Sequence, residues 1–215
     1  MITFDIETLP CNDESVIAEL EKAITPPGNI KKAESIKTWM DENKEAALLD
    51  LLAKTSFDGL YGRVACIAWA SDDGEIHSTT PDDSEADAIE SFFDYVAFDC
   101  SPSFCGHNLH GFDLTFLKHR SIILGSRPPK SLLAAMNSKP WDDCIQDTML
   151  MWNQDKQKRV SMDKLCRALG IAGKGDFDGS MVAKTWPVDP QKVIDYCIDD
   201  VRRTREIYKR LTFNQ

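Results

Sequence analysis

Hydrophobic and polar residues alternate at the start of the chain, in residues 2–8 (Ile-Thr-Phe-Asp-Ile-Glu-Thr), and this alternation predicts a β-strand. Successive side chains of a strand point to opposite faces, so the apolar residues share one face while Asp5 and Glu7 share the other. Two buried carboxylates on one face repel each other, and each loses its hydration. A bound divalent cation would offset both the repulsion and the lost hydration. Alternatively, the segment is an edge strand, and the two carboxylates lie on its solvated face.

Residues 11–59 are more polar and predict a helical insertion between the first and second strands. A short helix or ordered loop is expected first, then a break at Thr25-Pro26-Pro27-Gly28. Two amphipathic helices are expected over residues 30–54. The pattern is compatible with simple surface packing and with contact to a substrate.

The rest of the chain alternates strand-like and helix-like segments. Strands are expected at 63–71, 75–80, 103–108 and 144–145, the first two joined by a tight turn at 72–74. Helices are expected at 81–97, at 112–124 with Ile122 facing inward, from Asp147 to 151, at 162–169 and at 190–211, with a basic loop at 126–140. This order predicts an α/β fold, in which helices flank a mixed central sheet, as one domain over residues 1–215.

Composition narrows the class of protein. With 42% hydrophobic and 28% charged residues the chain is an ordinary globular protein, and no apolar run is long enough to span a membrane. No signal peptide is visible, and seven cysteines without a C-x-x-C motif indicate reduced thiols, so a cytoplasmic location is expected. The net charge of −10 argues against a nucleic-acid partner. Two bound divalent cations would offset four of those charges.

Two later segments carry further candidate chemistry. Asp113 follows a predicted strand and opens a helix, where a plain N-cap is the alternative role. Tyr196 and Asp200 are four residues apart on a predicted helix, so they share a face that is flanked by apolar residues. Asp200 there needs a partner, which a nearby arginine could supply as well as a metal. His107 and His110 lack a third zinc ligand and are interpreted as structural or substrate-edge residues.

Three motifs together resemble one known family. Asp5-x-Glu7, Asn108-x-x-x-Phe112-Asp113 and Tyr196-x-x-x-Asp200 occur in the order of the DEDD exonuclease superfamily, which has an RNase H-like fold. Tyrosine at position 196, and aspartate rather than histidine at 195, resembles the tyrosine subtype. The first two motifs are most similar to the proofreading exonuclease domain of family B DNA polymerases, and the likeness extends over roughly residues 1–211.

The resemblance implies a site and a reaction. Asp5, Glu7, Asp113 and Asp200 would hold two divalent cations, Mg²⁺ or Mn²⁺, and Tyr196 would orient the attacking water. The expected reaction is 3′→5′ hydrolysis of terminal phosphodiester bonds in DNA, with single-stranded DNA as the expected substrate and nucleoside 5′-monophosphates as products. The substrate contacts implied are Thr8, Leu9 as a base-stacking wedge, Asn108 and Phe112.

The likeness also sets expectations about biological context. No polymerase region follows the nuclease motifs, so a stand-alone enzyme of replication or repair is expected, resembling phage-associated nucleases in a bacterial or phage-infected host cytoplasm. A DNA polymerase or recombination protein would be its partner in trans. An exoribonuclease, a non-catalytic nucleic-acid-binding module and a structural α/β domain remain alternatives. Basic residues at 127–139, 156–159 and 202–210 are either phosphate contacts or solvated surface.

Overall fold

The computed structural model describes residues 1–72, 74–100, 102–153 and 159–214. Within them a five-stranded mixed sheet has the order β3-β2-β1-β4-β5. The central strand β1 (Ile2–Leu9) pairs antiparallel with β2 (Arg63–Ser71) and parallel with β4 (Phe104–Gly106). The edges are β3 (His77–Ser78) and β5 (Ile145–Asp147). The predicted mixed sheet is therefore confirmed, and β1 is not an edge strand.

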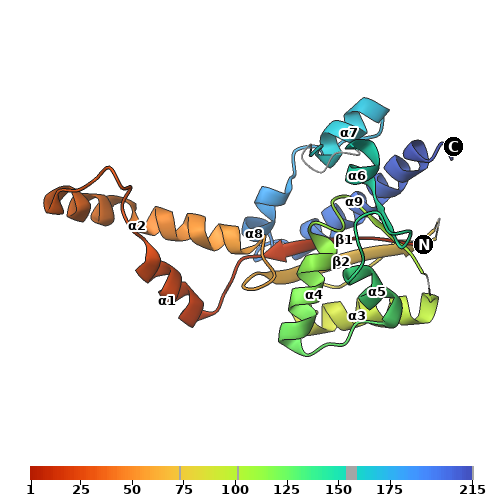
Figure 1. The fold of residues 1–215 in the computed structure, drawn as a ribbon, viewed down its shortest axis with the longest axis horizontal. Helices are drawn as coiled ribbons and strands as arrows, with labels where there is room; N and C mark the ends of the chain where they lie inside the picture. Colours follow the sequence, from red (N-terminus) through yellow and green to blue (C-terminus); the bar gives the residue numbers. More distant parts are fainter. Residues whose placement is uncertain (73, 101, 154–158, 215) are drawn as a thin grey trace.

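Helices cover both faces of the sheet (Figure 1). On one face, Ile2, Phe4 and Ile6 of β1 meet α3 (Glu85–Asp99), α4 (Asp113–Leu124) and α5 (Lys130–Met136) in the main core. On the other face, α9 (Pro190–Leu211) packs on β1 and β2 in a second cluster of small and branched residues. Because Asp5 and Glu7 alternate with the apolar residues, they face α9.

The insertion forms a helical arm, made of α1 (Glu14–Ala23) and α2 (Ala33–Thr55), that projects from the sheet (Figure 1). An ion pair of 2.7 Å between Lys44 Nζ and Glu21 Oε1 joins the two helices. The expectation of two helices over residues 30–54 is wrong, because α2 is one helix of 23 residues. No glycine or proline interrupts that segment, so nothing in its backbone ends a helix.

Other elements differ from the expectation in detail. The 126–140 segment contains α5, which buries Leu132, Ala135 and Met136, whereas a loop was expected. Ile122, expected to face inward, is 71% exposed. The second hairpin strand is only two residues long, and Asp73 of its turn lies outside the described residues.

The remaining elements lie between β5 and α9. They are α6 (Thr148–Asn153), α7 (Met162–Leu169), the short 3₁₀ helix η1 (Gly179–Met181) and α8 (Val182–Thr185). Asp147 caps α6 as expected, since its Oδ1 accepts a hydrogen bond from Met149 N at 3.0 Å. All seven cysteines are free thiols. Across the described residues, none of the helices has the length and apolar character that crossing a membrane requires.

Candidate active site

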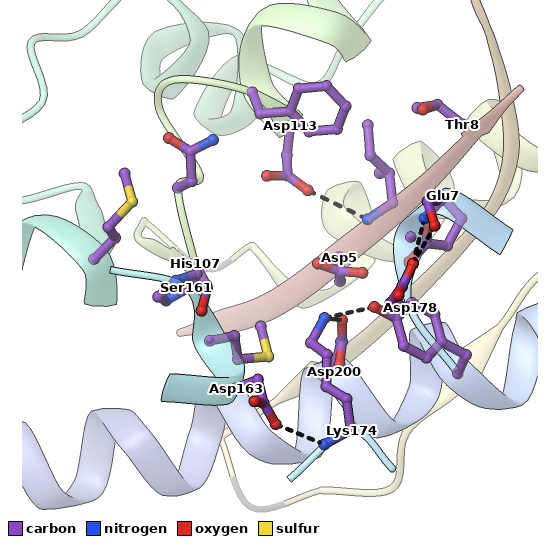
Figure 2. Close-up of a pocket in the computed structure, with 18 of the residues that line it drawn as sticks. Asp5, Glu7, Thr8, His107, Asp113, Ser161, Asp163, Lys174, Asp178 and Asp200 are labelled. Carbon is purple, nitrogen blue, oxygen red and sulfur yellow. Dashed lines mark hydrogen bonds and ion pairs between the residues drawn. The ribbon is translucent and has the colours of Figure 1, made fainter. Parts of the chain in front are cut away.

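Six acidic side chains line one pocket of about 800 Å³, namely Asp5, Glu7, Asp113, Asp163, Asp178 and Asp200. Figure 2 shows Asp5 and Glu7 on β1, Asp113 at the start of α4 and Asp200 on α9. Carboxylate oxygens of Asp5, Glu7 and Asp200 lie within 4.8 Å of one another. Residues far apart in sequence thus form a cluster of hard oxygen donors, which is the ligand chemistry that Mg²⁺ and Mn²⁺ prefer.

Asp113 lies beside this trio rather than within it. Its Oδ1 accepts a hydrogen bond of 3.3 Å from the backbone N–H of Ile6, the residue between the two acids of β1. Asp113 is the first residue of α4, and Phe112 holds the N-cap position. The side chain is therefore not the cap of its own helix, and it is buried against β1 instead.

Burial makes these acids hard to ionise without a cation. Desolvation, followed by the nearby charge of Asp200, raises the pKa of Asp5 to about 8. Desolvation and then the charge of Asp5 raise the pKa of Glu7 well above its usual range. The pKa of Asp113 is raised well above its usual range by the same two causes in the same order. All three shifts favour the neutral acid, which a divalent cation would reverse.

Asp200 is the member of the cluster with positively charged partners. Arg203 Nη1 donates to its Oδ1 at 2.8 Å, so the arginine partner considered from sequence is present. Lys174 Nζ pairs with its Oδ2 and also donates to Tyr196 Oη at 2.6 Å. Sequence reasoning missed Lys174, because a lysine in a glycine-rich loop without P-loop spacing gives no local signal.

Tyr196 shares the pocket with Asp200, one helical turn away on α9. Its ring packs against Phe177, with centroids 5.0 Å apart. Burial, followed by the charges of Asp200 and Glu7, raises the pKa of its hydroxyl, so the phenol stays protonated. Its oxygen accepts a hydrogen bond from Lys174, and a hydrogen bond between the phenol and Asp200 is among the causes that raise its pKa.

The expected substrate contacts divide into two groups. Thr8, Asn108 and Phe112 line the pocket. Leu9 does not, since it is 6% exposed and packs in the cluster that includes Val182 of α8. Leu9 lies on the same face of β1 as Glu7, and α8 covers that face there, so the structure does not bring the expected base-stacking wedge into this pocket.

The two histidines are held by structural contacts, as expected. The ring nitrogens of His107 lie 2.9 Å from Thr148 Oγ1 and 3.0 Å from the carbonyl oxygen of Val160, and the residue lines the pocket. Burial lowers the pKa of His107. His110 Nε2 lies 3.0 Å from the carbonyl oxygen of Ser138.

A solved structure shows the class of this fold. The family B DNA polymerase from the hyperthermophilic archaeon Pyrobaculum calidifontis matches with a TM-score of 0.62 and 17% identity, over 98% of this chain and 24% of that chain. The chain thus spans about a quarter of the polymerase, and the likeness shows the RNase H-like fold of a polymerase exonuclease domain. The comparison with curated proteins gives no match.

A family model described as "Predicted 3'-5' exonuclease related to the exonuclease domain of PolB" matches residues 60–215. The chain belongs to this family. The matched range contains Asp113, Lys174, Tyr196 and Asp200. It leaves out β1 with its two acids, as well as the helical arm.

Proposed function

We propose that the chain is a metal-dependent 3′→5′ exonuclease that hydrolyses the terminal phosphodiester bonds of single-stranded DNA and releases nucleoside 5′-monophosphates. The observation that carries this proposal is the trio of carboxylates within 4.8 Å, in a pocket that also contains a phenol and an ammonium group. The family and the fold support the direction of hydrolysis. The same relationship supports a role in DNA replication or repair.

The donor set fits two divalent cations, Mg²⁺ or Mn²⁺. Asp5, Glu7 and Asp200 offer only oxygen atoms, and burial makes their uncompensated negative charge costly. Asp113, hydrogen-bonded to the same strand, would complete the ligand set. Such a metal pair, when bound, supplies Lewis-acid stabilisation of the attacking and leaving oxygens of an in-line displacement.

The pocket's other groups act on water and phosphate. Tyr196 can donate its hydroxyl proton to the attacking water, because Lys174 satisfies the acceptor side of that hydroxyl at 2.6 Å. The Lys174 ammonium faces the carboxylate end of the pocket, where it would stabilise negative charge that develops on the phosphate. Thr8, Asn108 and Phe112 line the space assigned to the terminal nucleotide.

The basic segments differ in their relation to this pocket. Arg159, the last residue of the 156–159 segment, lines it together with Lys164, whereas residues 156–158 lie outside the described residues. The basic residues at 127–139 and 202–210 do not line it, and Arg203 is paired with Asp200. We assign the phosphate contacts nearest the site to Arg159 and Lys164.

A 5′-labelled single-stranded DNA oligonucleotide tests the proposal. Incubation with Mg²⁺ or Mn²⁺ should give a ladder that shortens from the 3′ end, and EDTA or Asp5→Ala should abolish it. Asp195→Ala is the matched control, since Asp195 is exposed on the same helix as Asp200 and does not line the pocket. If the protein shortens RNA but not DNA, the exoribonuclease takes the place of the proposed DNA exonuclease. If it binds DNA or RNA but cleaves neither, the non-catalytic binding module is favoured.

A further inference from the structure

We propose that Phe57, at the base of the helical arm, stacks on an unpaired base near the 3′ end of the substrate strand. This assignment rests on the proposed function, because it adds a substrate contact to the same pocket. It gives the arm a positioning role and requires a single strand at the site.

Phe57 is an exposed aromatic residue in the wall of a polar pocket. Its side chain is 73% exposed, yet it lines the pocket that holds Asp5 and Asp200. It belongs to none of the clusters of buried apolar residues. An aromatic ring that does not pack in the core, but faces a ligand-sized pocket, is suited to contact an apolar surface of the ligand.

The backbone that carries Phe57 is held from two sides. Thr8 Oγ1 of β1 donates to the carbonyl oxygen of Ser56 at 2.7 Å. Two residues after Phe57, the carbonyl oxygen of Gly59 accepts from Arg120 Nη1 of α4 at 3.2 Å. Gly59 lies so close to α4 that a Cβ atom there would be 2.9 Å from Phe116 O. The ring is therefore presented by a fixed turn, which lowers the entropy lost on binding.

The chemistry of the pocket identifies the contacting group as a nucleobase. Arg159, Lys164 and Lys174 line the same pocket and suit a phosphodiester backbone. The pocket as a whole is not basic, since six acidic residues line it together with these three cations. An exposed aromatic ring beside cations that contact the backbone is the combination by which proteins bind single strands without reading sequence. Every base offers a π-face, but only an unpaired base exposes it fully, so a duplex end would have to fray before Phe57 could stack on it.

The first test compares affinities for a 5′-fluorescein single-stranded DNA oligonucleotide by fluorescence anisotropy, in EDTA to prevent hydrolysis. Phe57→Ala should weaken binding about 5- to 150-fold, the range for loss of one base–aromatic stack. Phe57→Trp should retain binding. Phe98→Ala is the matched control, since Phe98 is 89% exposed on α3 and does not line the pocket, and its affinity should equal that of wild type. Equal melting temperatures establish that the variants are folded.

The second test removes one base at a time. An abasic nucleotide at the stacking position should weaken binding to wild type and leave Phe57→Ala unaffected, so that the two proteins bind that oligonucleotide alike. DNA should also quench the additional tryptophan fluorescence of Phe57→Trp, a change that a purely structural residue would not produce. The assignment is overturned if Phe57→Ala binds every oligonucleotide as wild type does, or if its loss of affinity is the same at every abasic position.

These outcomes separate the two proposals. If wild type shortens DNA and Phe57→Ala binds normally, only the role of Phe57 is wrong. If wild type neither binds nor shortens DNA or RNA, the proposed function itself is wrong.

Discussion

Asp5 and Asp200 belong to the same pocket, but their surroundings differ. Asp200 has two cationic partners, Lys174 and Arg203. Asp5 has a contact of 3.6 Å from the thiol of Cys197, and burial raises its pKa to about 8. Without metal, the protein would therefore hold a proton on Asp5 near neutral pH while Asp200 is compensated by its ion pairs. Metal binding should release that proton.

The raised pKa of Asp5 predicts a pH-dependent stability in EDTA. Its folded pKa exceeds the ordinary aspartate value of 3.8, so its contribution to stability is fully present below about pH 4 and is lost as pH rises towards about 8. Asp5→Asn cannot ionise and should escape this loss. The free energy of unfolding of Asp5→Asn, relative to wild type, should increase between these limits by up to about 1.4 kcal/mol per pH unit. Urea unfolding across this range measures it, and a constant difference would contradict the assignment.

Tyr196→Phe isolates the role of one hydroxyl group. The variant keeps the ring that packs on Phe177 and loses the atom that accepts from Lys174. We expect kcat for DNA hydrolysis to fall about 10²-fold, because one positioned hydrogen-bond donor is lost from the site. The increase in melting temperature with Mg²⁺ should be unchanged. A normal rate would remove Tyr196 from the mechanism.

At the scale of whole elements, local sequence signals predicted some helices to the residue. Residues 162–169 and 190–211 were expected as helices and are observed with those bounds. Ser161 caps the first, Gly170 ends it in the left-handed conformation, and Pro190 opens the second. In contrast, α5 was missed because prolines and basic residues dominate its segment, and its burial against the core is a tertiary effect.

The candidate site was predictable to the extent that its residues lie in short motifs. The spacing predicted that Asp5 and Glu7 share one face of β1, and that Tyr196 and Asp200 share one face of α9. The structure brings these two faces together in one pocket. Lys174 and Phe57 could not be predicted in this way. Each lies in a turn whose path is set by contacts with distant elements. The turn of Lys174 is held by hydrogen bonds with Asp163 and Arg203. The turn of Phe57 is held by a hydrogen bond from Arg120.

Arg120 joins three elements, and its loss should be costly. Its guanidinium donates two hydrogen bonds of 2.8 Å to Glu85 of α3 and a third to Gly59. The side chains of Arg120 and Glu85 are only 8% and 14% exposed. Arg120→Met would leave Glu85 buried without its charged partner, so we expect a loss of about 3–5 kcal/mol in the free energy of unfolding.

Two further variants complete the Arg120 prediction. Arg120→Met combined with Glu85→Gln should recover part of the loss, because the unpaired charge is gone. Arg202→Met removes an exposed ion pair with Asp199 and should cost less than about 1 kcal/mol. Equal effects of Arg120→Met and Arg202→Met in urea unfolding would contradict the role given to Arg120.

For the whole molecule, a net charge of −10 and a converging acidic cluster predict stabilisation by Mg²⁺. A ligand that binds only the folded state stabilises it by mass action, by about 2.7 kcal/mol at 100 times its dissociation constant. Thermal unfolding with increasing Mg²⁺ should show this in wild type and in Asp195→Ala. Asp5→Ala and Asp200→Ala should lose most of the increase, and an undiminished response in both would refute the metal site.

The trio of Asp5, Glu7 and Asp200 is assembled from the first strand and the last helix of the described fold. The thiol of Cys197 on α9 contacts the carbonyl oxygen of Asp5 at 3.3 Å, across 192 residues of sequence. On the ribosome, β1 emerges before α9, so its acidic face stays uncovered until α9 has been synthesised and has docked. Contacts this distant in sequence form slowly. A partly synthesised chain would therefore carry no complete site, and hydrolytic activity should appear only after α9 has folded onto the sheet.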